Sequence, residues 1–208
     1  FYEAIKWNSK VKNDYHIFCS QAIYPLKGLH QVLKAISLLK HDYPQIKLSI
    51  AGINITKNTT FIEKVKISGY ALYLNKLIKE FDLEDTVVFT GTLSEIKMIE
   101  MYQKSHIFIS PASIENSPNS LGEAQLIGVP SIASYVGGVP DMIEEGKTGL
   151  IYRFEEFEML ADNVRKIFED DDLANELSEN GIRVAQERHS QISNLDRTLE
   201  IYSAIKNH

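Results

Sequence analysis

Hydrophobic residues along the chain gather in two kinds of segment, short unbroken runs and longer stretches with helical spacing. A short unbroken run is typical of a strand that is buried on both faces of a sheet. Such runs predict strands at 16–20, 47–51, 86–90, 106–110, 130–134 and, shorter, 149–152.

Between these runs, apolar side chains recur every three or four positions, which places them on one face of a helix. Two such faces are formed by Val32, Leu33, Ile36 and Leu39 and by Leu74, Leu77, Ile78 and Phe81. Ser94 is suited to cap a helix that continues through Tyr102, and after Tyr152 the pattern is wholly helical. The alternation predicts an α/β fold, a Rossmann-like doubly wound parallel sheet with helices on both faces.

Ligands of such sheets bind at the carboxyl ends of the strands, in the loops that lead into the helices. The loops of interest are therefore 21–28, 52–58, 91–94, 111–121 and 137–140. The polar stretch 54–69 has no clear period, and we interpret it as a mobile loop with a helical turn.

Composition narrows the range of partners. Of the 208 residues 44% are hydrophobic, and a chain of this length buries enough surface to fold as one domain. The net charge of −6 argues against a nucleic-acid partner, because binding to a phosphate backbone needs a basic surface. A pocket with a few cations or oriented amides can still hold a phosphorylated small ligand.

The single cysteine, Cys19, lies inside an apolar run and is interpreted as a small buried residue. No disulfide can form within the chain, which fits a reducing cytoplasm. No apolar run approaches the ~20 residues of a membrane span, so neither a span nor a signal peptide is expected. The chain begins without Met, which suggests a fragment.

Lys27 is a first candidate for ligand binding, because it stands beside Gly28 where a helix is predicted to begin. A cation and free amides at a helix start suit a diphosphate. The loop lacks the G-x-G-x-x-G and Walker patterns, which disfavours dinucleotide oxidoreductases and P-loop proteins. Taken alone, Lys27 is better interpreted as a solvated surface lysine.

Glu115 and Glu123 form a second candidate, with Glu115 predicted in the loop after a strand and Glu123 in the next helix. Ser117 and Pro118 suit the cap and first position of that helix, and Asn119 or Ser120 are alternative caps. Carboxylates accept hydrogen bonds from sugar hydroxyls and free amides donate to anions, which suits a polyhydroxy ligand that carries phosphate. Two ordinary surface charges would have the same spacing.

Gly137 and Gly138, just before Pro140, form a third candidate. Paired glycines allow positive φ and a close approach of the backbone to a ligand. A tight turn from a strand into a helix explains them equally well.

Taken in order, these pieces resemble the group 1 glycosyltransferases of GT-B fold. The resemblance covers about residues 16–205 and rests on Pro25-x-Lys27-Gly28, Glu115-x7-Glu123-Ala124, Gly128-x-Pro130, Val136-Gly137-Gly138-x-Pro140 and Gly146-x-x-Gly149. In that family two Rossmann-like domains face each other, and the C-terminal one holds the nucleotide-diphosphate sugar. The resemblance implies that 16–189 is this donor domain. It also implies that 1–15 links to a missing N-terminal acceptor domain, and that 190–208 packs back toward it as a helix.

The resemblance also implies roles for single residues. Glu115 matches the glutamate at the donor sugar, Glu123 the one that binds the ribose, and Lys27 the lysine that neutralises the diphosphate. The other implied donor-binding residues are Asn119, Ser120 and Leu121 through their amides, Thr92 and Leu93 beside the base, and Gly137 and Gly138.

Two departures from the family pattern stand out. Gln21 and Ala22 occupy the place of the usual Gly-Arg, whose Arg is a second cation for the diphosphate. Asn116-Ser117-Pro118 replaces the usual Gly-Phe-Gly. Either other groups donate to the phosphate here, or the affinity for the diphosphate is lower.

The implied reaction is retaining transfer of a sugar from a nucleotide-diphosphate sugar to an acceptor that the sequence does not identify. Lys27 and helix amides would stabilise the departing diphosphate, and Glu115 would hold the sugar. No cofactor is implied, and because no metal-ligand set is visible we expect a metal-independent reaction.

The expected location is the cytoplasm, and peripheral association of the full-length protein with the inner face of the membrane stays open. Three rival interpretations remain. They are a nucleotide-sugar epimerase of the same architecture, a non-catalytic sugar-nucleotide-binding module, and a Rossmann-like dehydrogenase domain.

Overall fold

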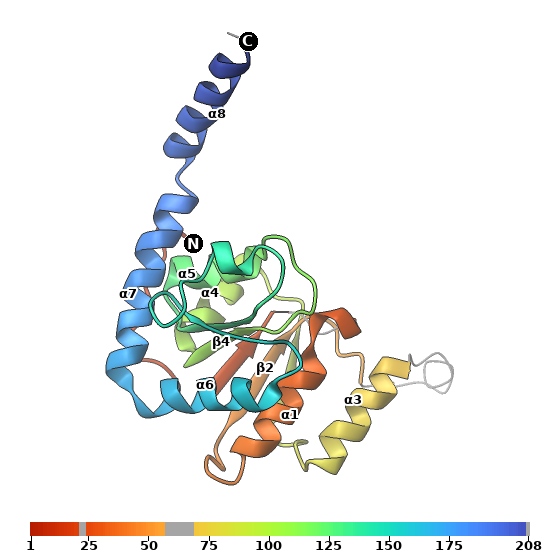
Figure 1. Cartoon of the computed structure of the whole chain (residues 1–208). Coiled ribbons are helices and arrows are strands. Elements are labelled where there is room, and N and C mark those ends of the chain that lie inside the picture. Colours follow the sequence, from red (N-terminus) through yellow and green to blue (C-terminus); the bar gives the residue numbers. More distant parts are fainter. Residues whose placement is uncertain (21–23, 57–68, 207–208) are drawn as a thin grey trace.

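The computed structural model describes residues 1–20, 24–56 and 69–206 (Figure 1). These residues form the strands β1 (His16–Cys19), β2 (Lys47–Ala51), β3 (Val87–Gly91), β4 (Ile107–Ser110), β5 (Ser131–Ser134) and β6 (Leu150–Tyr152). Neighbouring strands all pair in parallel, in the order β3-β2-β1-β4-β5-β6. Each strand lies within one residue of its predicted bounds, so the α/β, Rossmann-like doubly wound sheet is confirmed.

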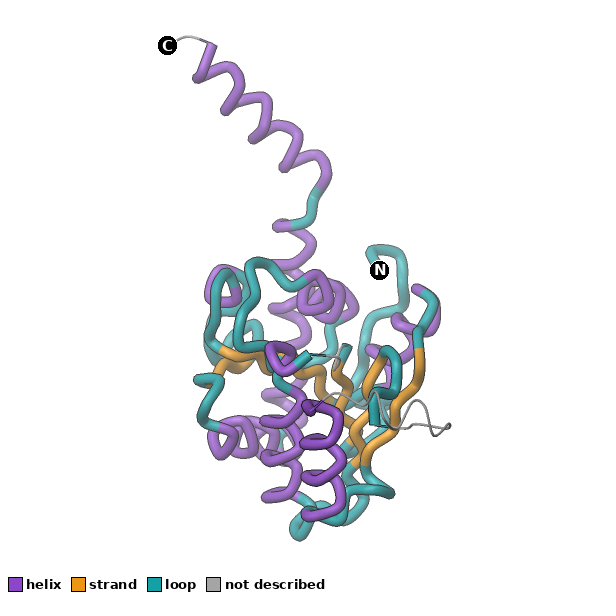
Figure 2. Tube along the Cα trace, turned by 90° about the vertical axis from the view of Figure 1, so that its right-hand side faces the viewer, coloured by secondary structure: helices purple, strands orange, loops and turns teal. Residues whose placement is uncertain are grey.

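Two layers of helices cover this sheet (Figures 1 and 2). One layer consists of α1 (Leu29–Leu39), which packs against α3 (Gly69–Glu80) and α6 (Phe157–Glu169). In the other layer, α5 (Asn119–Ile127) packs against α4 (Glu95–Lys104) and α7 (Asp171–Arg188). The short turns η1 (Pro25–Lys27) and η2 (Val139–Asp141) follow β1 and β5.

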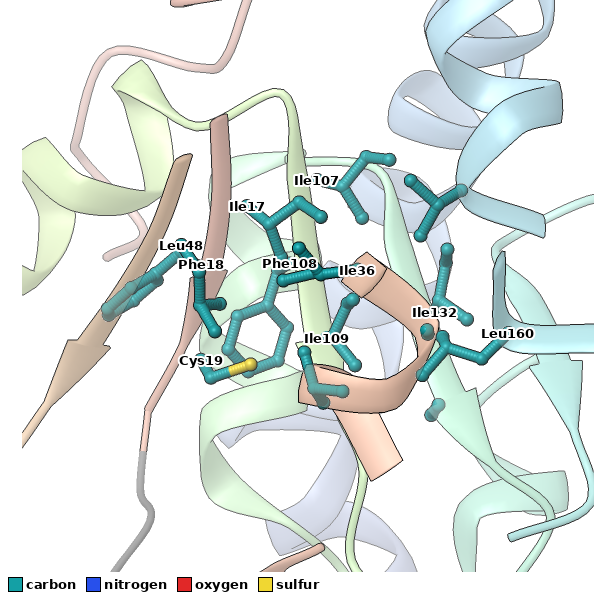
Figure 3. Packing of buried hydrophobic residues seen from close by; sticks show 14 of the residues in the cluster. Ile17, Phe18, Cys19, Ile36, Leu48, Ile107, Phe108, Ile109, Ile132 and Leu160 are labelled. Atoms are coloured by element: carbon teal, nitrogen blue, oxygen red, sulfur yellow. The ribbon is translucent and has the colours of Figure 1, made fainter. Parts of the chain in front are cut away.

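Side chains alternate across the central strands and supply both layers with an apolar partner. Phe18 of β1 and Phe108 of β4 each place a ring 5.3 Å from the ring of Tyr102 on α4. On the other face, Ile36 of α1 and Leu160 of α6 are fully buried against the sheet (Figure 3). Cys19 is also fully buried, as expected.

The two predicted helix starts have different outcomes. Ser94 caps α4, because its side chain accepts a hydrogen bond from the amide of Lys97 at 3.4 Å. The predicted caps of α5 are wrong: Pro118 occupies the cap position, extended at φ −68° and ψ 110°, and no side chain caps the helix. Ser117 does not bond back to the helix, because its hydroxyl contacts the sulfur of Met142 at 3.7 Å.

The two chain ends behave differently. Trp7 is buried, its indole N–H donates to the carbonyl of Ser105 at 2.7 Å, and its amide donates to the carbonyl of Ile127 at 2.8 Å. The helix α8 (Gln191–Lys206) instead extends away from the domain and buries no residue (Figure 1). The assignments of 1–15 to a linker and of 190–208 to a contact with another domain stay predictions.

Two further expectations concern the loops and the membrane. Most of the polar stretch 54–69 lies outside the described residues, as do Gln21 and Ala22. In the described part of the chain, no helix is both long and apolar enough to cross a bilayer.

Candidate functional site

The loop between β4 and α5 is held on two sides by glycine turns. A Cβ atom added at Gly28 would lie 1.8 Å from the carbonyl oxygen of Pro111, and one added at Gly137 would lie 1.6 Å from that of Glu115. Both glycines also have positive φ, +73° and +49°. No side chain fits at either position, because the backbone of the turns after β1 and β5 is in direct contact with the backbone of this loop.

A cavity of about 370 Å³ opens beside this loop at the carboxyl ends of β1 and β4. Five residues predicted for the site line the cavity: Lys27, Glu115, Asn119, Ser120 and Glu123. Glu115 lies in the loop and Glu123 in α5. The prediction that the two carboxylates reach one crevice is therefore confirmed.

Lys27 and Glu115 form an ion pair across the cavity wall, in which the lysine ammonium contacts Glu115 Oε1. Their side chains are 30% and 20% exposed, so solvent screens the pair only in part. Lys27 is the last residue of η1, and the Gly28 turn directs the chain into α1. The pair joins the turn after β1 to the loop after β4, which the sequence separates by 88 positions.

Glu123 is half-buried in the cavity wall, and Tyr102 of α4 lies behind it. The Tyr102 hydroxyl is 3.1 Å from Glu123 Oε2 and 3.1 Å from the carbonyl oxygen of Ser120. Burial raises the pKa of the Glu123 carboxyl, and the hydrogen bond from Tyr102 opposes part of that rise. Burial also raises the pKa of the Tyr102 hydroxyl well above its ordinary value.

The first turn of α5 supplies backbone donors. Asn119 and Ser120 stand at the start of the helix, where amides have no intrahelical acceptor, and both line the cavity. The amide of Leu121 was expected among the donors, but it donates to the carbonyl of Pro118 at 3.0 Å, and the Leu121 side chain is fully buried. Of the three residues expected to supply amides, Asn119 and Ser120 line the cavity, and the amide of Leu121 is already bonded.

The remaining predicted residues lie outside the cavity lining. Gly137 and Gly138 approach the backbone of Glu115 and Asn116, so in this structure they shape the loop. Thr92 is exposed after β3, and Leu93 packs partly against the core. Their contact with a base stays a prediction. Within the described residues, no three Asp, Glu, His or Cys side chains gather as a metal cluster.

Four residues in or directly behind the cavity wall were not predicted. Ser20 and Ser110 line the cavity at the ends of the first and fourth predicted strands, so the rule that ligands bind at strand ends could have found them. Met98 of α4 also lines the cavity and carries no signal in the sequence. Tyr102 carries a weak one, because a tyrosine on the apolar face of a helix needs a partner for its hydroxyl.

Comparison with known proteins identifies the family of this chain. The family described as glycosyl transferases group 1 matches residues 2–184. CapM of Staphylococcus aureus, a capsular polysaccharide biosynthesis glycosyltransferase, is 25% identical over 191 residues, which cover 88% of this chain and 46% of CapM. The chain therefore belongs to the group 1 glycosyltransferases.

Solved structures extend the likeness to the fold. HepE from Anabaena, in complex with UDP, matches with a TM-score of 0.77 at 22% identity over 94% of this chain and 50% of HepE. The C-terminal domain of LpcC, a group 1 family glycosyl transferase from Francisella tularensis, matches with a TM-score of 0.70 at 18% identity, over 88% of this chain and 89% of that domain. The sheet thus has the Rossmann-like fold of GT-B enzymes, and the chain spans about half the length of CapM and HepE.

The close contact between Gly137 and the backbone of Glu115, which we call the glycine clamp, leads to a prediction about stability. Gly137→Ala is expected to destabilise the domain by more than the ~1–2 kcal/mol of a left-handed alanine, because its Cβ would also overlap the Glu115 carbonyl. Gly146→Ala is the matched control, since Gly146 has φ +75° and open space around its Cβ position. Urea denaturation compares the two variants, and equal losses of stability would contradict the clamp.

Proposed function

We propose that this chain binds the nucleotide-diphosphate sugar donor of a retaining glycosyl transfer, in the cavity beside the β4–α5 loop. The observation that carries the proposal is the convergence of Lys27, Glu115, Glu123 and the first amides of α5 on one cavity. Structures of HepE with UDP and with UDP-glucose support it, because HepE has the same fold.

Each group in the cavity has a separate role in this proposal. Lys27 and the amides of Asn119 and Ser120 stabilise the negative charge that develops on the diphosphate as its bond to the anomeric carbon breaks. The acceptor hydroxyl forms the new bond on the same face of the sugar, and its proton passes to an oxygen of the leaving phosphate. Glu115 accepts from hydroxyls of the sugar, and Glu123 accepts from those of the ribose.

The ion pair between Lys27 and Glu115 implies that a bound diphosphate competes with Glu115 for Lys27. A diphosphate that reaches Lys27 replaces Glu115 as the partner of its ammonium. The freed Glu115 carboxylate can then accept from the sugar, so a sugar and a diphosphate together satisfy both partners. A nucleoside diphosphate without a sugar satisfies Lys27 and leaves Glu115 without its cation.

We expect Lys27→Ala to weaken UDP binding by about 1.5–3 kcal/mol, roughly ten- to hundredfold, and to leave uridine binding unchanged. Isothermal titration calorimetry measures both ligands, and Lys76→Ala, an exposed lysine on α3, is the control for net charge. Affinities in EDTA are expected to be unchanged, because Lys27 and amides neutralise the diphosphate. Equal weakening of UDP and uridine would contradict this role.

The two glutamates are expected to separate by ligand. Glu123→Gln should weaken UDP and UDP-glucose alike by on the order of 1–3 kcal/mol, because the ribose hydroxyls lose a charged acceptor. Glu115→Gln should weaken UDP-glucose alone and tighten UDP by up to about fivefold, because the diphosphate no longer competes for Lys27. Glu176→Gln, an exposed position on α7, controls for lost charge. If both cavity variants matched this control, the site assignment would fail.

We further propose that residues 16–189 are the C-terminal, donor-binding half of a two-domain enzyme and that acceptor contacts come from an N-terminal domain. Support comes from the match to 89% of the LpcC C-terminal domain and from the coverage of about half of CapM. In this arrangement 1–15 is the linker, and α8 crosses to the other domain. The exposed Leu195, Leu199 and Tyr202 of α8 are 59%, 54% and 67% accessible and would gain an apolar partner there.

This arrangement predicts binding without catalysis by the present chain. Purified 1–208 is expected to bind UDP, yet to transfer no sugar from UDP-glucose or other nucleotide sugars to any acceptor in a panel of glycans and polyols. Product analysis by mass spectrometry measures the outcome. Formation of a glycoside by this chain alone would refute the division of labour, whether or not the donor site is correct.

A further inference from the structure

Tyr102 joins the aromatic core to the cavity and has no role in the scheme above. Its side chain is fully buried on α4, with the rings of Phe18 and Phe108 each 5.3 Å away. Its hydroxyl lies at the edge of this cluster, 3.1 Å from Glu123 Oε2 and 3.1 Å from the Ser120 carbonyl oxygen. Both acceptors belong to the start of α5, the helix that provides the cavity wall.

Packing alone does not explain a tyrosine at this position. A phenylalanine would make the same ring contacts, and burying a hydroxyl is favourable only when it is hydrogen-bonded. The hydroxyl has one hydrogen to share between the carboxylate and the carbonyl. Among the described residues, Tyr102 provides the hydrogen bond that reaches the Glu123 carboxylate.

We propose that Tyr102 is a positioning residue, which fixes one oxygen of Glu123 so that the other is directed to the ribose hydroxyls of the bound nucleotide. The proposal rests on the proposed function, since it needs a nucleotide in the cavity. A glutamate held in one rotamer before binding loses less side-chain entropy when the ligand arrives. The hydroxyl of Tyr102 thereby increases selectivity for ribonucleotides over nucleotides that lack these hydroxyls.

The hydrogen bond from Tyr102 also affects the charge state of Glu123. Burial raises the pKa of its carboxyl, the Tyr102 hydroxyl lowers it, and the nearby Glu95 carboxylate raises it. A protonated carboxyl is a weaker acceptor for two hydroxyls than a carboxylate. Ribose-dependent binding should therefore weaken as the pH falls through the pKa of Glu123, and loss of the Tyr102 hydroxyl should move that midpoint to higher pH.

The test compares Tyr102→Phe with wild type by calorimetry, using UDP and 2′,3′-dideoxy-UDP. The variant is expected to bind UDP about three- to tenfold more weakly, the effect of one hydrogen bond, and dideoxy-UDP within twofold of wild type. Tyr43→Phe is the matched control, because Tyr43 also donates from a buried ring to a carboxylate, Glu169 Oε1 at 2.6 Å, outside the cavity lining. It should leave both affinities unchanged.

Two further measurements separate positioning from general stability. Combining Tyr102→Phe with Glu123→Gln should weaken UDP no more than Glu123→Gln alone, and the pH midpoint of UDP binding should rise in Tyr102→Phe. A third needs no variant: the Tyr102 hydroxyl proton should exchange slowly in the wild-type proton NMR spectrum and shift when UDP binds. Fast exchange with and without UDP overturns the proposal.

The outcomes also separate the inference from the function on which it rests. If wild type binds none of UDP, GDP and ADP, the proposed function fails and the inference fails with it. If wild type binds UDP with a preference over dideoxy-UDP that Glu123→Gln abolishes, the function stands. In that case, a Tyr102→Phe variant that keeps the full preference overturns the inference alone.

Discussion

The loop between β4 and α5 can carry Glu115 into the cavity because the turns on both sides of it have no side chains at the points of contact. Gly28 and Gly137 would each place a Cβ less than 2 Å from a carbonyl oxygen of this loop, at Pro111 and Glu115. The strand order puts β4 between β1 and β5, so the turns that follow those strands are the neighbours of this loop. Close backbone contact among the turns after β1, β4 and β5, which are neighbours in the sheet, therefore fixes where the charged groups of the site lie.

Given that constraint, the chemistry of the cavity follows from a small number of charges. Lys27 directly precedes Gly28, and the backbone of Glu115 lies against Gly137, so the two charged side chains are brought together and form an ion pair. Such a pair keeps a partly buried cation and anion satisfied until a ligand with complementary groups separates them. An overall charge of −6 does not exclude an anionic ligand, because such a ligand needs only a few local donors, such as a lysine and the amides at a helix start.

The second glutamate depends on the core more than on the loops. Glu123 lies on α5, and its position relative to α4 is set by the rings of Phe18, Phe108 and Tyr102. Tyr102 belongs both to that apolar cluster and to the polar network at the cavity, which ties the packing between two helices to the orientation of a carboxylate. A change in the packing of this cluster would therefore change the orientation of the Glu123 carboxylate in the cavity.

The sequence by itself determined the order and type of the elements, because unbroken apolar runs such as 106–110 and the helical face from Val32 to Leu39 are local patterns that burial enforces. It also placed Lys27, Glu115 and Glu123 at strand ends and in the following helix, since parallel strands bring their carboxyl ends to one edge. Only the tertiary structure decided that Gly137 meets the backbone of Glu115, that Pro118 precedes α5 without a side-chain cap, and that Tyr102 reaches Glu123. These are contacts between segments distant in sequence or choices among neighbouring residues of similar propensity. Local patterns fix neither, because both depend on how the packed elements meet.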